Sequence, residues 1–287
     1  MRDILGYADN FKSWTSGMEC AARLAAQLEA RLTGVYVCPS ALGAMPAYDA
    51  PQLLSSVIEE IREIESLAHA EAPSFEQRAR ELGVRKAAWQ VAEGYVPNVL
   101  AHLGNWHDLL VLGRDPEMPW GTVPLLGSIV LGCHLPCLVV PPGLTQPKLD
   151  TIVIAWNGSP EAIRAIHAAG PLLARAKRIV VLRGREREQF SEIGWNPEFD
   201  LSRYFAREDL SVEQRPLQTS EADAGIAILA AADSQRADMI VMGAYGRTRF
   251  SEWAFGGATR HVLAEAKVPV LMRHWRRTQA PIAEPCR

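Results

Sequence analysis

The sequence contains no apolar run that approaches the roughly 20 residues needed to span a bilayer. Residues 1–9 also lack the long apolar segment and the small-residue cleavage site of a secretory signal, because they enter a strand pattern at once. We therefore expect a cytoplasmic protein that does not bind a membrane. The net charge of −3 argues against a nucleic-acid partner, since contact with a phosphate backbone requires a basic surface.

Cysteines are few, and chemically reactive groupings are missing. The chain has five cysteines, an odd number spread along the sequence, which favours free thiols in a reducing compartment. Cys133, His134 and Cys137 are spaced like part of a zinc site, but no second pair of ligands stands nearby. The histidines are scattered, and no nucleophile stands beside a base. The sequence therefore predicts no metal centre and no enzyme active site.

What the sequence does contain is an internal repeat. The matching segments are 4–9 with 152–157, 18–32 with 160–175, 108–113 with 238–243, and 135–140 with 268–272. The segment pair 18–32 and 160–175 is rich in alanine and is predicted to be helical. The other three pairs are apolar and are predicted to be strands. Strands that alternate with helices predict an α/β fold with a parallel sheet. We expect two domains, at 1–143 and 149–276, followed by a disordered tail at 277–287.

The two copies differ in length. Matching residues are 148 positions apart at Asp9 and Asn157 but 130 apart at Gly113 and Gly243, so the first copy holds 18 extra residues. We place many of them in a loop near residues 39–55, where Pro, Gly and Ala cluster. The other predicted helices are 51–82, 96–103, 200–208 and 225–232, and the other predicted strands are 35–37, 87–89, 179–182 and 211–217.

A glycine-rich segment follows the fourth strand of the second copy. Gly243 closes the strand, Gly246 lies in the loop, and a helix opens after Gly256 and Gly257. Glycines let the backbone approach a ligand closely, and the N–H groups at the start of a helix favour an anion such as phosphate. Arg247 can screen phosphate charge. The segment is not a Walker A loop, because no Gly-Lys-Ser/Thr follows, and it is not the dinucleotide fingerprint, which follows the first strand.

The spacing Gly-x2-Gly-x9-Gly, followed by a small or hydroxyl residue, a helix and a Val-Pro-Val strand, resembles the universal stress protein family, in particular its tandem-domain bacterial members. The resemblance covers nearly the whole chain, twice. It implies a doubly wound, five-stranded parallel sheet of order 3-2-1-4-5, a Rossmann-like fold, in each copy. Some members bind ATP at the carboxyl ends of the strands, where the strand order reverses. There, an acidic residue contacts the nucleoside and the glycine loop holds the ribose and phosphates.

Carried over by position, the resemblance assigns nucleotide binding in the second copy to Asn157, Met242, Gly243, Gly246, Arg247, Gly256, Gly257, Ala258 and Thr259. Two positions depart from the family pattern. Asn157 replaces an Asp and loses its charge, and Gly257 replaces a Ser and loses a hydroxyl. Purely structural roles also stay open: Asn157 suits a turn cap, the glycines suit a sharp turn, and Arg247 suits an exposed surface.

The first copy keeps Asp9, Gly113, Gly127 and Ser128 as weaker candidates. However, Pro116 stands where the second glycine is expected, and the loop is one residue longer and holds two further prolines. Each proline removes an N–H donor from a cradle that is made of such donors. We therefore expect this site to bind nucleotide weakly or not at all.

Two functional hypotheses follow. The leading one is a cytoplasmic stress-response sensor or regulator that binds ATP or a related adenine nucleotide mainly in the second copy, with Mg²⁺ accompanying it and at most slow hydrolysis. The alternative is a scaffold that binds no nucleotide and acts through protein partners, with pockets that are vestigial or hold another ligand. The last strand of each copy is a sheet edge that needs cover, so we predict an intrachain pseudo-dimer through these strands. A further homodimer is compatible with the sequence.

Overall fold

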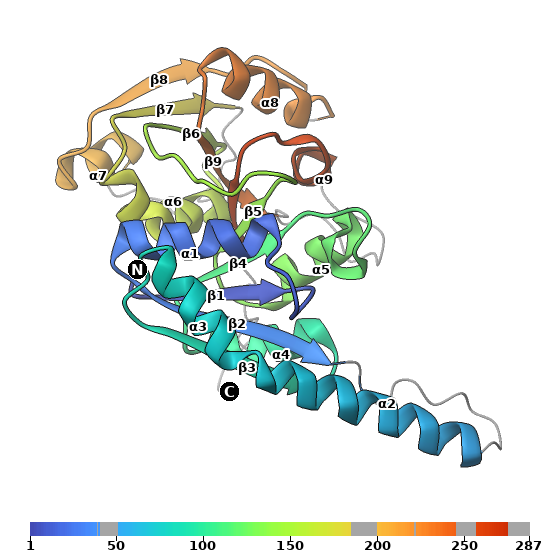
Figure 1. The fold of residues 1–287 in the computed structure, drawn as a ribbon. Helices are drawn as coiled ribbons and strands as arrows, with labels where there is room; N and C mark the ends of the chain where they lie inside the picture. The colour runs from blue at the N-terminus through green and yellow to red at the C-terminus, as the bar shows by residue number, and fades with distance from the viewer. Residues whose placement is uncertain (39, 41–50, 185–199, 221, 245–256, 275–287) are drawn as a thin grey trace, which may run out of the picture.

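The computed structural model describes residues 1–38, 40, 51–184, 200–220, 222–244 and 257–274, and it contains one sheet of ten strands. The strand order is β3-β2-β1-β4-β5-β10-β9-β6-β7-β8, and helices lie on both faces (Figure 1). The first half contributes the strands β1 (Asp3–Ala8), β2 (Arg31–Cys38), β3 (Ala87–Glu93), β4 (Leu109–Gly113) and β5 (Cys137–Val140). The second half contributes the strands β6 (Thr151–Trp156), β7 (Arg178–Arg183), β8 (Val212–Pro216), β9 (Met239–Ala244) and β10 (Val270–His274). Each half therefore has the strand order 3-2-1-4-5, which confirms the predicted fold class.

The helices follow the same alternation. Those of the first half are α1 (Ser16–Leu28), α2 (Pro51–Ala70), α3 (Ala72–Glu81), α4 (Val96–Gly104), the short 3₁₀ turn η1 (Pro119–Gly121) and α5 (Val123–Gly132). Those of the second half are α6 (Pro160–Leu173), α7 (Leu201–Arg207), α8 (Ala224–Ser234) and α9 (Gly257–Glu265). The start of α6 is as its sequence predicts, because the Ala162 N–H donates to the Ser159 hydroxyl at 3.2 Å and Pro160 begins the helix.

The two halves join through their last strands. β5 and β10 pair antiparallel, with Val139 opposite Val270, Leu138 opposite Leu271 and Cys137 opposite Met272. The pairings within each half are parallel. The predicted intrachain pairing of the final strands is thus confirmed, and each half covers the sheet edge of the other.

The core consists of two apolar layers, one on each face of the sheet. One layer packs the sheet against α1, α3 and α6, and the other packs it against α4, α5, α8 and α9. Both layers contain residues from both halves, so the core continues across the junction. The strands that flank the junction are buried on both faces, which is why they appear in the sequence as continuous apolar runs.

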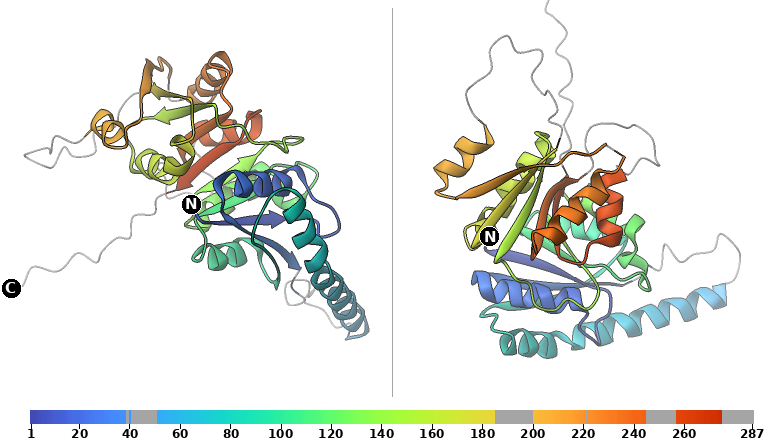
Figure 2. Two further views of the ribbon diagram at one scale, coloured as in Figure 1. Left: turned by 60° about the vertical axis from the view of Figure 1, so that its left-hand side comes forward. Right: turned by 90° about the horizontal axis from the view of Figure 1, so that it is seen from above.

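Two sequence-based predictions are wrong in detail. The first helix ends at Leu28, because Glu29 adopts a left-handed conformation (φ 54°) and caps it, so Leu32 lies in β2. The predicted helix 51–82 begins at Pro51 as expected, but it is two helices that meet at Glu71, and residues 51–55, which the predicted loop near 39–55 also included, belong to the first of them. In both views of Figure 2, α2 extends away from the body of the molecule. The described residues of the second half contain no counterpart of this helix. The predicted tail at 277–287 lies outside the described residues.

Candidate functional site

The strand order reverses between β6 and β9, which are neighbours in the sheet. Ala155 of β6 lies opposite Met242 of β9, so Asn157 and Gly243 follow at adjacent strand ends. The loop after β9 leads to the start of α9, which therefore lies at the same edge of the sheet, because α9 must run back to begin the parallel strand β10. Crevices at such reversal points are the usual ligand sites of open α/β sheets.

Gly243 is required by packing. A Cβ atom at this position would lie 2.6 Å from the Ala162 nitrogen and 2.7 Å from the Glu161 carbonyl carbon, in the first turn of α6. The first half achieves the same close approach through the helix, since a Cβ on Gly17 of α1 would lie 2.7 Å from the Gly113 Cα atom, whereas a Cβ on Gly113 would lie 3.7 Å from Gly17. In each half one glycine therefore lets the fourth strand approach the helix after strand one, whether or not a ligand binds: Gly243 on the strand in the second half and Gly17 on the helix in the first.

Asn157 caps a turn. Its side-chain oxygen accepts a hydrogen bond from the Ser159 N–H at 3.1 Å, and Gly158 between them has a positive φ of 72°. The turn-capping interpretation of Asn157 is confirmed. Because the carboxamide oxygen is used in this way, the side-chain NH₂ group is the part of Asn157 best placed to contact a ligand.

The start of α9 is open to solvent at its first residue. Gly257 is exposed, and a Cβ on it would meet no atom within 4 Å. Ala258 packs against α8, where a Cβ on Gly225 would lie 3.1 Å from the Ala258 Cα atom. Thr259 is buried, with 4% of its surface exposed. The predicted site residues Gly246, Arg247 and Gly256 lie outside the described residues.

The corresponding loop of the first half, residues 114–122, bonds to itself. The Asp115 N–H donates to the Gly121 carbonyl at 3.2 Å, and the Gly121 N–H donates to the Met118 carbonyl at 3.1 Å. The Met118 N–H donates to the Asp115 carbonyl at 3.2 Å, and the Glu117 N–H donates to the Asp115 carboxylate at 3.0 Å. Pro116 offers no N–H group at all. The backbone N–H groups of Asp115, Glu117, Met118 and Gly121 are thus engaged within the loop and are not presented to a phosphate.

The other first-half candidates are also placed differently from their partners in the second half. Gly127 and Ser128 lie inside α5, which begins four residues before Gly127, at Val123. Gly127 is buried, and the Ser128 hydroxyl donates to the Leu125 carbonyl at 2.7 Å. Neither residue therefore lies in a loop that faces a ligand.

Comparison with known proteins gives the family. The model of the universal stress protein family matches residues 148–274. The chain is also 23% identical to the universal stress protein Slr1230 of Synechocystis sp., over 94% of this chain and 99% of that protein. Residues 148–274, the second half of the chain, therefore match the universal stress protein family. This confirms the resemblance seen in the sequence.

Two solved structures share the fold of this chain over both halves. A universal stress protein from Archaeoglobus fulgidus DSM 4304 matches with a TM-score of 0.66 and 15% identity, over 95% of this chain and 96% of that one. A functionally unknown protein from Pseudomonas aeruginosa PAO1 matches with a TM-score of 0.55 and 17% identity, over 95% and 92%. At these identities the likeness supports the fold.

The electrostatics of the first half disfavour an anion. Asp9 follows β1 as the family pattern expects, but burial, and to a lesser extent the nearby Asp115 carboxylate, raise its pKa to about 7. Two carboxyl groups therefore share the edge of the sheet where the resemblance would place a nucleotide. A phosphate brought to this edge would be repelled by both once Asp9 is ionised.

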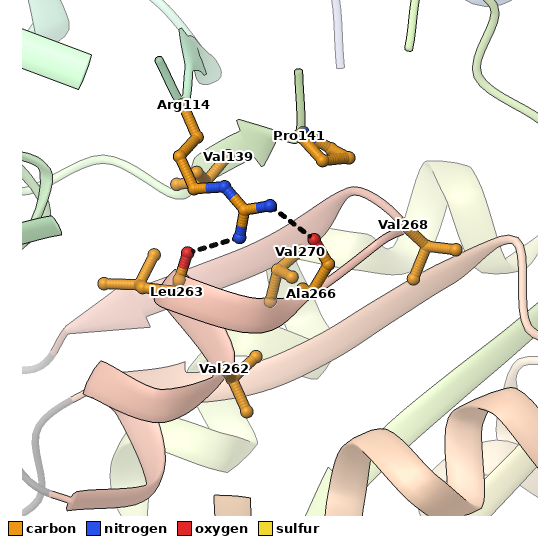
Figure 3. Close-up of a pocket in the computed structure, with 8 residues that line it drawn as sticks. All are labelled: Arg114, Val139, Pro141, Val262, Leu263, Ala266, Val268 and Val270. Carbon is orange, nitrogen blue, oxygen red and sulfur yellow. Dashed lines mark hydrogen bonds between the residues drawn. The ribbon is translucent and has the colours of Figure 1, made fainter. Parts of the chain in front are cut away.

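Arg114 links the halves in a way that no sequence pattern indicates. It follows Gly113 in the first half, and its guanidinium donates to the Leu263 and Ala266 carbonyls of the second half at 2.8 and 2.9 Å, and also to that of Ala264 (Figure 3). These are the last carbonyls of α9, which a cation caps favourably. Apolar side chains of both halves, including Val139 and Val270, surround the contact.

Among the described residues, no three His, Cys, Asp or Glu side chains are grouped so as to hold a metal ion. None of the helices in the described part of the chain is both long enough and apolar enough to cross a membrane.

Proposed function

We propose that this protein acts as a universal stress protein and binds ATP or a related adenine nucleotide in its second half, at the carboxyl ends of β6 and β9. The observation that carries the proposal is the meeting of three features at one edge of the sheet: the strand-order reversal, Asn157 and the exposed start of α9 at Gly257. In this arrangement the nucleoside lies near Asn157 and Met242, and the phosphates lie at the first turn of α9.

The chemistry of α9 supports this placement. A helix N-terminus carries unpaired N–H groups and a partial positive charge, which stabilise a phosphate. Gly257 leaves open space there, since a Cβ on it would touch nothing within 4 Å. Gly246, Arg247 and Gly256 complete the proposed loop, Ala258 and Thr259 continue the helix, and Mg²⁺ accompanies the phosphates.

We assign the first half, residues 1–143, a supporting role beside the nucleotide-binding half, residues 149–276. Its loop uses its own N–H donors, and Asp9 and Asp115 make its sheet edge negative. The protein would act in the cytoplasm as a stress-response sensor or regulator with at most slow hydrolysis, and a homodimer is compatible with this role.

Titration calorimetry of the full chain with ATP tests the proposal, and a matched pair of variants locates the site. Gly257→Asp places a negative charge at the start of α9, where it favours the helix but repels phosphate. Thr122→Asp adds the same charge at the start of α5, in the first half. We expect ATP binding to weaken at least tenfold in Gly257→Asp and to stay unchanged in Thr122→Asp.

The outcomes separate the alternatives. Absence of ATP binding by the wild-type chain at millimolar concentration would overturn the proposal, and loss of binding in Thr122→Asp alone would move the site to the first half. Mass spectrometry of freshly purified, denatured protein adds an independent check, because a bound adenine nucleotide would be released.

The second candidate function is a scaffold without nucleotide. It is favoured by the finding that the Asn157 oxygen is used by a turn and that Gly243 is explained by packing. Under this hypothesis the purified protein releases no nucleotide and the Gly257→Asp variant keeps all its protein partners.

A further inference from the structure

Two thiols lie side by side where the halves of the protein join. The Cys133 and Cys137 sulfur atoms are 3.1 Å apart, and the residues are 1% and 0% exposed. Cys133 caps the end of α5, and Cys137 begins β5, where it pairs with Met272 of β10. The pair therefore lies at the turn between α5 and β5, the strand that pairs with β10 where the halves join.

The geometry of this turn suits a disulfide. A disulfide bond has an S–S distance of about 2.05 Å, so the two sulfurs need to approach each other by only about 1 Å. His134, which lies between them, already adopts a left-handed conformation (φ 52°) that folds the chain back on itself. Both sulfurs also point at one backbone oxygen, that of Leu135, at 3.7 and 3.6 Å.

The turn has a route to solvent. Gly132 and His134, the neighbours of Cys133 in the chain, are exposed, so the buried Cys133 is flanked on both sides by residues that contact solvent. Local opening of such a surface turn costs far less than global unfolding, and it can admit a small oxidant.

The surroundings also distinguish the two thiols from each other and from the rest. The hydrogen bond from the Cys137 thiol lowers the pKa of Cys133, and the charge of Arg273 in β10 acts in the same direction. The pKa of Cys137 is raised by the same contact. By contrast, Cys20 is buried alone in α1, and burial raises its pKa to about 12. Since the thiolate is the nucleophile, Cys133 is the more reactive of these groups.

We propose that Cys133 and Cys137 form a dithiol redox site at the junction of the halves, which hydrogen peroxide oxidises to an intramolecular disulfide. The Cys133 thiolate attacks one peroxide oxygen, the O–O bond breaks, and the departing hydroxide takes a proton to leave as water. The Cys137 sulfur then attacks the sulfenic sulfur of Cys133, the S–O bond breaks, and a second water leaves with the Cys137 proton. Two thiols are oxidised by two electrons in total, and one peroxide is reduced to two waters.

Peptide mapping tests this directly, because both cysteines fall in one tryptic peptide. No Lys or Arg stands between Arg114 and Lys148, so digestion gives the peptide 115–148. The full, folded chain is treated with hydrogen peroxide, cleared with catalase, denatured and labelled with N-ethylmaleimide. We expect the peptide to carry no label and to have lost two hydrogen atoms, and we expect dithiothreitol to restore two labelled cysteines. Cys20 should stay labelled throughout.

Alanine variants provide the controls. Cys133→Ala and Cys137→Ala should leave the remaining cysteine of the peptide free of any disulfide, whereas Cys20→Ala, which removes another buried thiol, should oxidise like the wild type. Two labels on the wild-type peptide after peroxide treatment, or equal oxidation of Cys20, would overturn the proposal. The wild-type measurement decides the matter even if a variant fails to fold, and it does not depend on nucleotide binding.

Discussion

The carboxyl ends of β4 and β9 occupy equivalent places in two halves that share one strand order, yet the described residues around them differ in kind. In the first half, the loop 114–122 forms hydrogen bonds within itself, and Asp9 and Asp115 lie at the sheet edge. The second half has an uncharged Asn157 at that edge and an open Gly257 at the helix start. The comparison teaches that close packing of the fourth strand against the helix after strand one is common to both halves and depends on Gly17 in one and Gly243 in the other, whereas suitability for an anion depends on the charge at the sheet edge and on the space at the helix start.

The largest effect is expected at the packing glycine of the second half. Gly243→Ala would place a Cβ atom 2.6 Å from the backbone of α6, and we expect it to lower the free energy of unfolding by about 3 kcal/mol. Urea denaturation measures this change. Gly257→Ala is the matched control, because its Cβ meets open space, and it should leave stability within about 1 kcal/mol of the wild type. Equal stability of the two variants would contradict the packing role of Gly243.

The next effect concerns the contact that makes the halves unequal. Arg114→Ala removes the cation that caps the end of α9, and we expect a loss of about 2 kcal/mol in the free energy of unfolding. Arg114→Lys keeps the charge but not the fork of donors, so it should recover only part of the loss. Hydrogen exchange provides a second measurement, because faster exchange should appear in α9 and not in α1. Uniform exchange in both helices would contradict a local role.

The third effect concerns Asp9, which the substitution Asp9→Asn changes to the residue type of its second-half counterpart, Asn157. The folded-state pKa of Asp9 is about 7, above its ordinary value of 3.8, so the folded protein holds a proton that the unfolded chain has released between these pH values. The stability of the wild type should therefore fall as pH rises from about 4 to about 7 through this group. Asp9→Asn should remove that slope and add about 1–2 kcal/mol at pH 8, after allowance for solvent screening.

Thermal unfolding at pH 5 and pH 8 checks this third prediction. Glu81→Gln, which removes an exposed carboxylate on α3, serves as the control and should leave the pH dependence unchanged. An Asp9→Asn variant that is no more stable than the wild type at pH 8 would contradict the pKa shift.

The smallest expected effect concerns the affinity for ATP at the start of α9. Gly257→Ser adds a hydroxyl at the open start of α9, and if ATP binds there we expect severalfold tighter binding, equivalent to about 1 kcal/mol for one hydrogen bond. Calorimetry with ATP measures the change. Ser128→Gly in the first half should not alter the affinity, because that hydroxyl is bonded inside α5.

Most of the fold could be predicted from the sequence alone. Buried parallel strands appear as continuous apolar runs, so residues 108–113 and 238–243 indicated two central strands, and the repeat of the whole pattern predicted two equivalent sheets. The Ser159 cap was predictable because capping depends on residues that are neighbours in the chain. The extension of the first helix to Leu32 was wrong because a left-handed Glu29, rather than a glycine, ends that helix.

The tertiary structure alone decided the contacts that make the two halves unequal. Arg114 meets the end of α9 about 150 residues further along the chain, Asp9 shares its environment with Asp115, and Gly243 fits against the backbone of α6. Local patterns carry no information about such distances, since charge, burial and close approach at a site depend on segments far apart in the sequence. The sequence by itself therefore determined the alternation of strands and helices in each half, through the apolar character of each segment, while the strand order followed from the family resemblance of the glycine motif and the pairing of the last strands from their need for edge cover. The closeness of Cys133 to Cys137 and the electrostatic character of each sheet edge emerged only when the folded chain brought these side chains together.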